Sequence, residues 1–273
     1  LDVLKDKKKL LTEVKNYLLE ENTYTKKIME DTKSIQKTLF EEIKGRIKLE
    51  DESLPFRDKK YDYWAKTTKK GNYFKKLRRK IGDEKIEIYW DGDLEAKGKK
   101  FFNTGDLSVS NNDKLLAYSI DTRGSEYFSI FIRVISDNKI IDEEIKDTSG
   151  SITWSYDDKF IFYSKLDEFH RPRKIFRHEI GTPVKNDKLI FEEKDEKFTC
   201  NISTSSDEKF YFITTSEHTT SEFYYFQDAN TPEPKLFLKR KEGVQYSMDS
   251  WAGYFWIHTN ENAKDFKICR CSQ

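Results

Sequence analysis

The residue types that most often do chemistry in proteins are sparse in this chain and lie far apart. None of its 11 glycines lies in a Gly-x-Ser-x-Gly sequence, so the sharp turn that presents a nucleophilic serine is missing. A glycine-rich phosphate loop and the His-Glu-x-x-His zinc motif are missing too. The sequence therefore predicts no catalytic residue and no cofactor site. The histidines stand singly, and we expect polar surface or hydrogen-bonding roles for them: His170, His178, His218 and His258.

Cysteine chemistry is equally limited. Cys269 and Cys271 form a Cys-x-Cys pair, but only His258 lies near them in the sequence and no second cysteine pair could complete a zinc site. With Cys200 the cysteines number three, an odd count at irregular spacing that does not form a disulfide framework. We therefore predict no metal site, and a reducing compartment such as the cytoplasm.

Charge and hydropathy argue against two classes of partner. The 50 lysines and arginines are balanced by 49 aspartates and glutamates, which disfavours a nucleic-acid-binding protein that relies on a basic face. No apolar run is long enough to span a bilayer, and the first residues do not resemble a secretion signal. We expect neither nucleic acid nor a membrane as a partner.

One short pattern occurs three times: a serine, three mostly polar residues and a lysine lead into an aromatic or aliphatic run. The copies are Ser110–Tyr118, Ser155–Tyr163 and Ser205–Ile213, and their lysines are 45 and 50 residues apart. Repeats of this length, built from short strands and polar turns, are typical of β-propeller blades. We interpret the acidic residue before each lysine as a turn former: Asp113, Asp158 and Glu208.

The chain from residue 51 onward is therefore predicted to consist of strands and turns. Each unit is expected to be a four-stranded antiparallel sheet, apolar on both faces, that must stack on its neighbours around an axis. Counted from Leu54, the chain holds four such units and part of a fifth, so we expect it to be part of a larger protein. Expected strands include 61–64, 72–74 and 86–89, with later units opening at 107–109, 152–154, 201–203 and 246–248.

The first part of the chain follows a helical period instead. Val14, Tyr17 and Leu18 recur at helical spacing, and Thr12 is the predicted N-cap of a helix over 13–29. A second stripe has one apolar residue at every fourth position: Ile35, Leu39, Ile43 and Ile47. We predict two amphipathic helices docked on a larger body. A membrane-surface or coiled-coil role is the alternative, for which both stripes are short.

The most distinctive stretch of the chain is Arg177–Asp195, which opens with Arg-His-Glu-Ile-Gly-Thr-Pro. Other distinctive segments are spread over nearly the whole chain: Glu21–Thr25, Glu41–Ile47, Pro55–Arg57, Thr219–Glu222 and Tyr246–Asp249. In this order the segments resemble the prolyl oligopeptidase family of serine peptidases, and its oligopeptidase B (protease II) branch in particular.

The resemblance implies a seven-bladed propeller that covers a catalytic α/β-hydrolase domain carrying Ser, Asp and His, in a protein that cleaves short peptides after Arg or Lys. The expected fold is mainly β, a partial seven-bladed propeller of about four and a half four-stranded antiparallel blades after two helices. Residues 1–50 would be the N-terminal helical segment, and 51–273 would hold blades 1 to 4 and part of blade 5. The catalytic domain would lie outside this chain, so the resemblance transfers no catalytic residue.

One loop of the second blade corresponds to a segment where the family places charged residues that face the catalytic domain. The resemblance makes Asp121, Arg123 and Glu126 candidates for this interdomain contact. Some relatives carry an arginine near the position of Ser125, so the residue that would form the pair stays open. An ordinary exposed loop is the alternative.

The leading hypothesis is thus the propeller, or lid, portion of an oligopeptidase B-like serine peptidase. Its implied partners are the catalytic domain of the same protein and, for the intact enzyme, short basic peptides. The chain alone is predicted to be inactive. Two alternatives remain: a stand-alone propeller that binds other proteins, and a truncated peptidase without activity.

Overall fold

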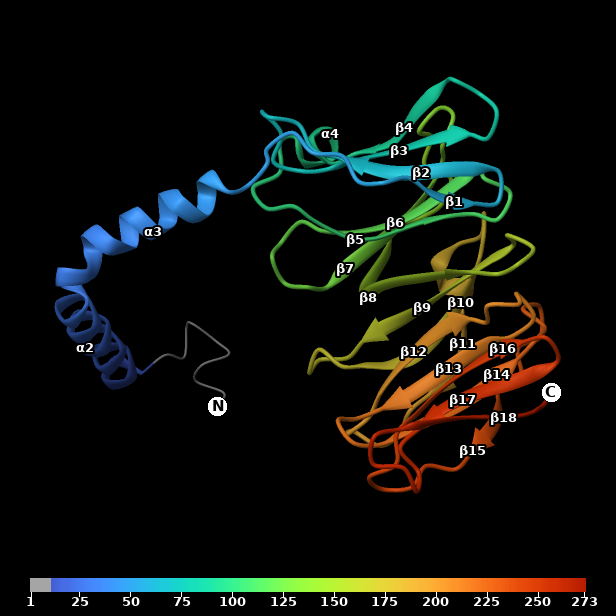
Figure 1. The fold of residues 1–273 in the computed structure, drawn as a ribbon. Helices are drawn as coiled ribbons and strands as arrows, with labels where there is room; N and C mark the ends of the chain where they lie inside the picture. Colours follow the sequence, from blue (N-terminus) through green and yellow to red (C-terminus); the bar gives the residue numbers. More distant parts are fainter. Residues whose placement is uncertain (1–10) are drawn as a thin grey trace.

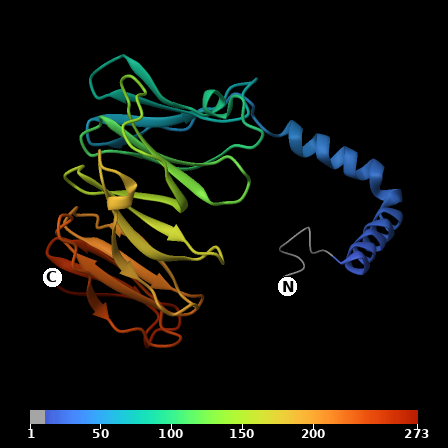
Figure 2. The ribbon, with the colours of Figure 1, turned by 180° about the vertical axis from the view of Figure 1, so that it is seen from behind.

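The computed structural model describes residues 11–273, so residues 1–10 of the predicted helical segment lie outside the described part. Two helices lead into a series of antiparallel sheets that follow one another along the chain (Figure 1). The view from behind shows the same arrangement, with both helices projecting away from the sheets (Figure 2).

The helices are α2 (Thr12–Ile28) and α3 (Lys33–Gly45), and the 3-10 turn η2 (Glu30–Thr32) joins them. Thr12 is the first helical residue rather than the predicted N-cap, and no side chain caps this end. Gly45 ends α3, in keeping with the low helix propensity of glycine, so Ile47 lies beyond the helix. No helix in the described range is long and apolar enough to cross a membrane.

The first sheet has the order β1-β2-β3-β4. The strand predicted at 72–74 is wrong, because Asp93 Oδ1 accepts the backbone N–H of Asn72 (2.9 Å) and of Tyr73 (3.2 Å), so the strand begins only afterwards. The elements are β1 (Phe56–Asp58), β2 (Tyr61–Lys66), β3 (Lys75–Lys80), β4 (Ile86–Asp91) and the short helix α4 (Gly92–Ala96).

The second and third blades share one long strand. Ile145 at the start of β8 pairs with Ile130 on β7, whereas Trp154 at its end pairs with Ile161 on β9. Between these halves the backbone turns at Gly150, whose φ is +90°. The elements of the two blades are β5 (Asn103–Val109), β6 (Leu115–Asp121), β7 (Phe128–Val134), β8 (Ile145–Trp154), β9 (Phe160–Leu166), β10 (Pro172–Glu179), η3 (Val184–Asn186) and β11 (Lys188–Glu192).

A four-stranded sheet and then a three-stranded sheet complete the chain. Both follow the antiparallel order of the sequence, and their first strands contain the predicted starts at 201–203 and 246–248. The strands are β12 (Thr199–Thr204), β13 (Tyr211–Ser216), β14 (Ser221–Phe226), β15 (Lys235–Leu238), β16 (Tyr246–Trp251), β17 (Tyr254–Thr259) and β18 (Lys267–Ser272).

Each central sheet is apolar on both faces. On β9, Phe160 and Phe162 belong to the core shared with β12 and β13, whereas Ile161 and Tyr163 belong to the core shared with β6, β7 and β8. Side chains alternate along a strand, so an unbroken apolar run is buried from both sides. This explains why an aromatic or aliphatic run follows each repeated lysine, and it confirms that the sheets stack on one another.

The first strands of successive blades meet around a common axis. Trp154 Nε1 on β8 donates to Ser108 O on β5 at 3.0 Å, and Thr153 Oγ1 on β8 donates to Ile202 O on β12 at 3.0 Å. With residues 58–59 of the first blade, these strands line a cavity of about 470 Å³. A cavity flanked by the first strands of successive blades is the geometry that a propeller produces.

The serine of each repeat is buried and holds its turn. Ser155 Oγ donates to Asp157 Oδ1 (2.7 Å) and accepts the backbone N–H of Phe160 (2.9 Å). Ser110 and Ser205 make the same bonds to the residues two and five positions later. The acidic residue before each lysine has a positive φ, which confirms its role as a turn former: 65° at Asp113, 59° at Asp158 and 55° at Glu208.

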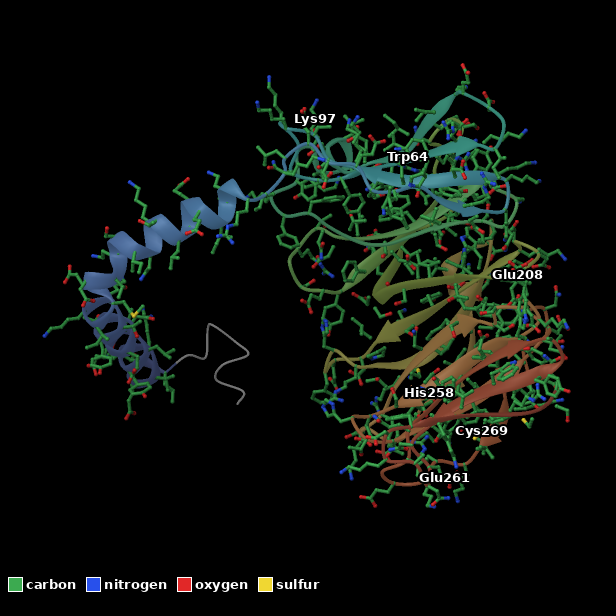
Figure 3. All side chains as sticks on the ribbon, in the orientation of Figure 1. Trp64, Lys97, Glu208, His258, Glu261 and Cys269 are labelled. Atoms are coloured by element: carbon green, nitrogen blue, oxygen red, sulfur yellow. The ribbon has the colours of Figure 1, made fainter. Side chains whose placement is uncertain are left out.

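The two ends of the sheets form different faces. Antiparallel strands alternate in direction, so the serine turns share one end and the loops between second and third strands share the other. The helices join this second end, because linker residue Ser53 donates its N–H to Ala65 O near the end of β2. Figure 3 shows Glu208, in a serine turn, on the side of the sheets away from the helices. We call these the serine-turn face (110–114, 155–159, 205–209) and the helix-side face (122–127, 167–171, 217–220).

Candidate interdomain face

Asp121 holds the loop between β6 and β7 together from inside. It is 1% exposed, and its carboxylate accepts the backbone N–H of Arg123 (2.8 Å), Gly124 (3.1 Å) and Glu126 (2.7 Å). Burial alone would raise the pKa of Asp121, but these backbone hydrogen bonds outweigh it and hold the pKa below its usual value. Asp121 therefore shapes the loop, and its role in an interdomain contact stays a prediction.

The charged side chains of Arg123 and Glu126 extend from this loop into solvent. Their side chains are 63% and 80% exposed. Arg123 Nη2 lies 3.8 Å from Asp147 Oδ1, and Glu126 Oε2 lies 3.9 Å from His170 Nε2. Charged contacts this long and this exposed contribute about 0–1 kcal/mol, and the Glu126–His170 contact is an ion pair only when the imidazole is protonated. Both side chains can therefore exchange these contacts for a partner's charges. Their interdomain role stays a prediction.

The loop between β9 and β10 is built in the same way and packs against the first loop. Asp167 Oδ1 accepts the backbone N–H of Phe169 and of Arg171, each at 2.9 Å. Burial alone would raise the pKa of Asp167, but these bonds outweigh it and lower the pKa. Tyr127 of the first loop donates its hydroxyl to Asp167 O (3.0 Å), and its ring meets that of His170 edge-on with centroids 4.4 Å apart.

In the third loop of this face, a glutamate accepts hydrogen bonds from its own loop in the same way. Glu217 Oε1 accepts the N–H (3.0 Å) and the hydroxyl (2.7 Å) of Thr219, and bonds from Thr219 and Thr220 lower the pKa of Glu217 to about 2. Sequence analysis missed this repeat because it lies outside the serine–lysine pattern and mixes two residue types. Its signal is an acid seven or eight positions after each turn lysine: Asp121, Asp167 and Glu217.

The two helices add apolar surface on the same side of the sheets. Neither α2 nor α3 has a buried residue. Within residues 11–273, the helices therefore do not pack on the larger body that was predicted for them. An apolar stripe that stays exposed along a helix marks an interaction surface. The exposed apolar residues are Tyr17, Leu18, Leu19, Tyr24, Ile28, Ile35, Leu39, Phe40 and Ile43.

Of the two roles expected for the histidines, polar surface or hydrogen bonding, His178 has the second, whereas the other three are exposed. His178 is fully buried, with Nδ1 2.7 Å from Asp187 Oδ1 and Nε2 3.7 Å from Asp142 Oδ2. Burial alone would lower the pKa of His178, but the two carboxylates outweigh it and raise the pKa to about 9. Asp142 belongs to the second blade, so the charged imidazole joins two blades. No group of three or more His, Cys, Asp and Glu within residues 11–273 could hold a metal ion.

Curated proteins with similar sequences are peptidases. The chain is 30% identical over 270 residues to Protease 2 of Moraxella lacunata, covering 95% of this chain and 39% of that protein. It is 29% identical over 283 residues to Dipeptidyl aminopeptidase BI of Pseudoxanthomonas mexicana, covering 97% and 39%. The chain thus spans about two fifths of the length of these relatives.

Solved structures give the same relationship. Oligopeptidase B from Trypanosoma brucei, with covalently bound antipain, superposes with a TM-score of 0.85 and 25% identity over 98% of this chain and 39% of its own. Oligopeptidase B from Leishmania major shows the same fold, with a TM-score of 0.86 and 24% identity over 98% and 39%. A family profile described as the N-terminal beta-propeller domain of prolyl oligopeptidase matches residues 3–273. The chain therefore belongs to the prolyl oligopeptidase family, and its sheets are blades of that family's N-terminal β-propeller domain.

Proposed function

We propose that this chain is the lid portion of an oligopeptidase B-like serine peptidase that hydrolyses short peptides after Arg or Lys. The observation that carries the proposal is the match of residues 3–273 to the propeller domain of a peptidase family. Similarity to Protease 2 and to two oligopeptidases B supports this type of enzyme within the family. The acyl-enzyme would form on a serine of the α/β-hydrolase domain, the partner that the resemblance implies.

The helix-side face has the physical properties of a contact that opens and closes. The apolar stripes of α2 and α3 would provide a water-excluding contact, at about 25 cal/mol for each Å² that they bury. Arg123 and Glu126 would add exposed charge pairs, which stabilise a closed state weakly and keep it reversible. A lid needs this balance because it must reopen to admit substrate and release product. Asp121 would act by holding the loop in shape.

The cytoplasm is the proposed location of this enzyme. The described cysteines are free: Cys200 is buried, and Cys269 and Cys271 are exposed. Burial raises the pKa of the Cys200 thiol to about 12, so this residue stays protonated and unreactive. Two exposed thiols are best kept reduced in a compartment with a reducing thiol pool.

The activity is tested with short fluorogenic peptides on two proteins: the chain alone, and the chain joined to an α/β-hydrolase domain. We expect no hydrolysis by the chain alone. The joined protein is expected to cleave after Arg and Lys, and serine-directed inhibitors are expected to abolish this cleavage. Matched peptides with proline at the cleaved bond, and substrates that report dipeptide release, are included because relatives bear the names prolyl endopeptidase and dipeptidyl aminopeptidase BI.

Each of the remaining outcomes would support a different hypothesis. Preferred cleavage after proline or release of dipeptides would contradict the proposed specificity, while leaving the lid role intact. Hydrolysis by the chain alone that survives serine-directed inhibitors would contradict the lid role itself. An inactive joined protein would favour the truncated peptidase, and an isolated chain that is monodisperse and binds other proteins would favour the stand-alone module.

A further inference from the structure

A groove between the first and second blades opens on the serine-turn face and is rimmed by three lysines. Lys60 lies in the β1–β2 turn, Lys80 ends β3, and Lys114 ends the serine turn of the second blade. The groove has a volume of about 430 Å³. Within residues 11–273, none of these three ammonium groups lies within ion-pair distance of a carboxylate, whereas the counterparts of Lys114 in the two later serine turns do.

In the two later serine turns, an aspartate pairs with the lysine and neutralises its charge. Lys159 Nζ lies 3.1 Å from Asp157 Oδ2, and Lys209 Nζ lies 3.8 Å from Asp207 Oδ2. In the second blade the corresponding position holds Asn112 instead of an aspartate. This single difference removes the carboxylate that would pair with the lysine of the turn.

Asn112 also supplies a hydrogen-bond donor to the groove. Its Oδ1 accepts the Ser110 hydroxyl (2.9 Å) and the Lys114 backbone N–H (3.0 Å), which fixes the orientation of the amide. The Nδ2 amino group is therefore left to donate at the groove that Asn112 lines. Together with the Ser136 hydroxyl, the rim presents donors and positive charge.

The floor of the groove is nearly neutral. Arg78 is 5% exposed, stacks on the Tyr61 ring at 4.4 Å and pairs through Nε with Glu87 Oε2 at 2.9 Å. The buried carboxylate of Asp113 accepts the Tyr63 hydroxyl at 3.3 Å, below the rim. One buried carboxylate thus stands against three ammonium groups, and the groove keeps a net positive charge.

We propose that this groove binds a small multivalent phosphate anion, such as diphosphate or triphosphate. Lysine ammonium groups act as point charges that suit phosphate oxygens, and the Asn112 amide adds a directed bond. The guanidinium of Arg78 covers the Tyr61 ring, so the groove offers no free aromatic face for a nucleobase. The groove lies on the face away from the helices, so this binding is independent of the proposed peptidase function.

Binding is tested by isothermal titration of the 273-residue chain with diphosphate and triphosphate at constant ionic strength, with sulfate and a glutamate-rich peptide for comparison. We expect one tight site for the phosphates and weaker binding of the other two probes. Asn112→Asp is the decisive variant, because aspartate makes the same serine bond in both later turns and should preserve the fold. The added carboxylate is expected to weaken phosphate binding by about tenfold or more.

Two matched controls separate the groove from general charge. Asn262→Asp makes the same charge change in the exposed turn between β17 and β18, at a residue that does not line the groove, and should leave the affinity within about twofold. Replacing Lys60, Lys80 and Lys114 by Gln should abolish binding, whereas the same change at Lys69, Lys70 and Lys97 should not. Figure 3 shows Lys97 near the helix side of the sheets. Equal losses in variants and controls, or tighter binding of the acidic peptide, would overturn the proposal.

Discussion

At the scale of single residues, this propeller places charge where it joins one blade to the next. His178 lies between Asp187 of its own blade and Asp142 of the preceding blade. The Tyr163 hydroxyl donates to Asp187 Oδ2 at 2.7 Å and completes the network. A buried imidazolium is favourable only because two carboxylates face it, so the contact depends on its proton.

This dependence predicts a loss of stability at alkaline pH. The pKa of His178 is raised to about 9 in the folded chain, above its unfolded value of 6.5, so its charged form contributes stability fully below pH 6.5. That contribution is lost as the pH rises from 6.5 through 9. The free energy of unfolding, measured with urea, should fall by about 1–3 kcal/mol over this range.

The matched variants for this test are Asp142→Asn and His218→Gln. Asp142→Asn keeps an oxygen for the Gly181 N–H, which donates to Asp142 Oδ1 at 2.8 Å, but removes one carboxylate from His178. The pH dependence should therefore shrink in this variant. His218→Gln changes a histidine outside the network and should leave the profile unchanged. Identical pH profiles for all three proteins would show that His178 does not carry the effect.

At the scale of secondary-structure elements, the parts that sequence could predict are those that local contacts determine. The serine turns follow from bonds within five residues, so their pattern in the chain predicted them correctly. The strand predicted at 72–74 failed because Asp93, about twenty residues later, takes the backbone N–H groups. The direction of the Asp121 carboxylate could not be predicted from the sequence either, because it depends on the path of the loop around it.

The bend in β8 is a further feature that only the folded chain reveals, and it predicts an unequal effect of two glycine substitutions. At Gly150, with φ of +90°, an added Cβ would lie 2.9 Å from the Phe128 ring. At Gly181, with φ of +82°, an added Cβ would meet nothing within 4 Å. Gly150→Ala should lower the free energy of unfolding by about 2–4 kcal/mol, and Gly181→Ala by about 1 kcal/mol.

Urea denaturation of both variants measures this difference. Both alanines would have a strained positive φ, but only the one at position 150 would also clash with the Phe128 ring. The expected excess for Gly150→Ala reports the close packing of β8 between the second and third blades. Equal destabilisation by the two substitutions would contradict a tight bend at this position.

At the scale of the whole molecule, the two ends of the sheets form faces with different properties. The stacking of the blades could be predicted from the repeats, because each sheet is apolar on both sides and needs neighbours. The placement of α2 and α3 could not, because their apolar stripes find no surface within the described residues. The charged loops of the helix-side face therefore lie on the same side of the sheets as the exposed apolar helices. The serine-turn face carries the lysine-rimmed groove.

Hydrogen exchange, followed by mass spectrometry, tests this difference between the faces most directly. The chain alone is compared with the same chain joined to an α/β-hydrolase domain. We predict slower exchange in the joined protein for α2, α3 and the loops at 122–127, 167–171 and 217–220, with no change in the serine turns at 110–114, 155–159 and 205–209. Protection of the serine turns with none in the helices and loops would contradict this prediction.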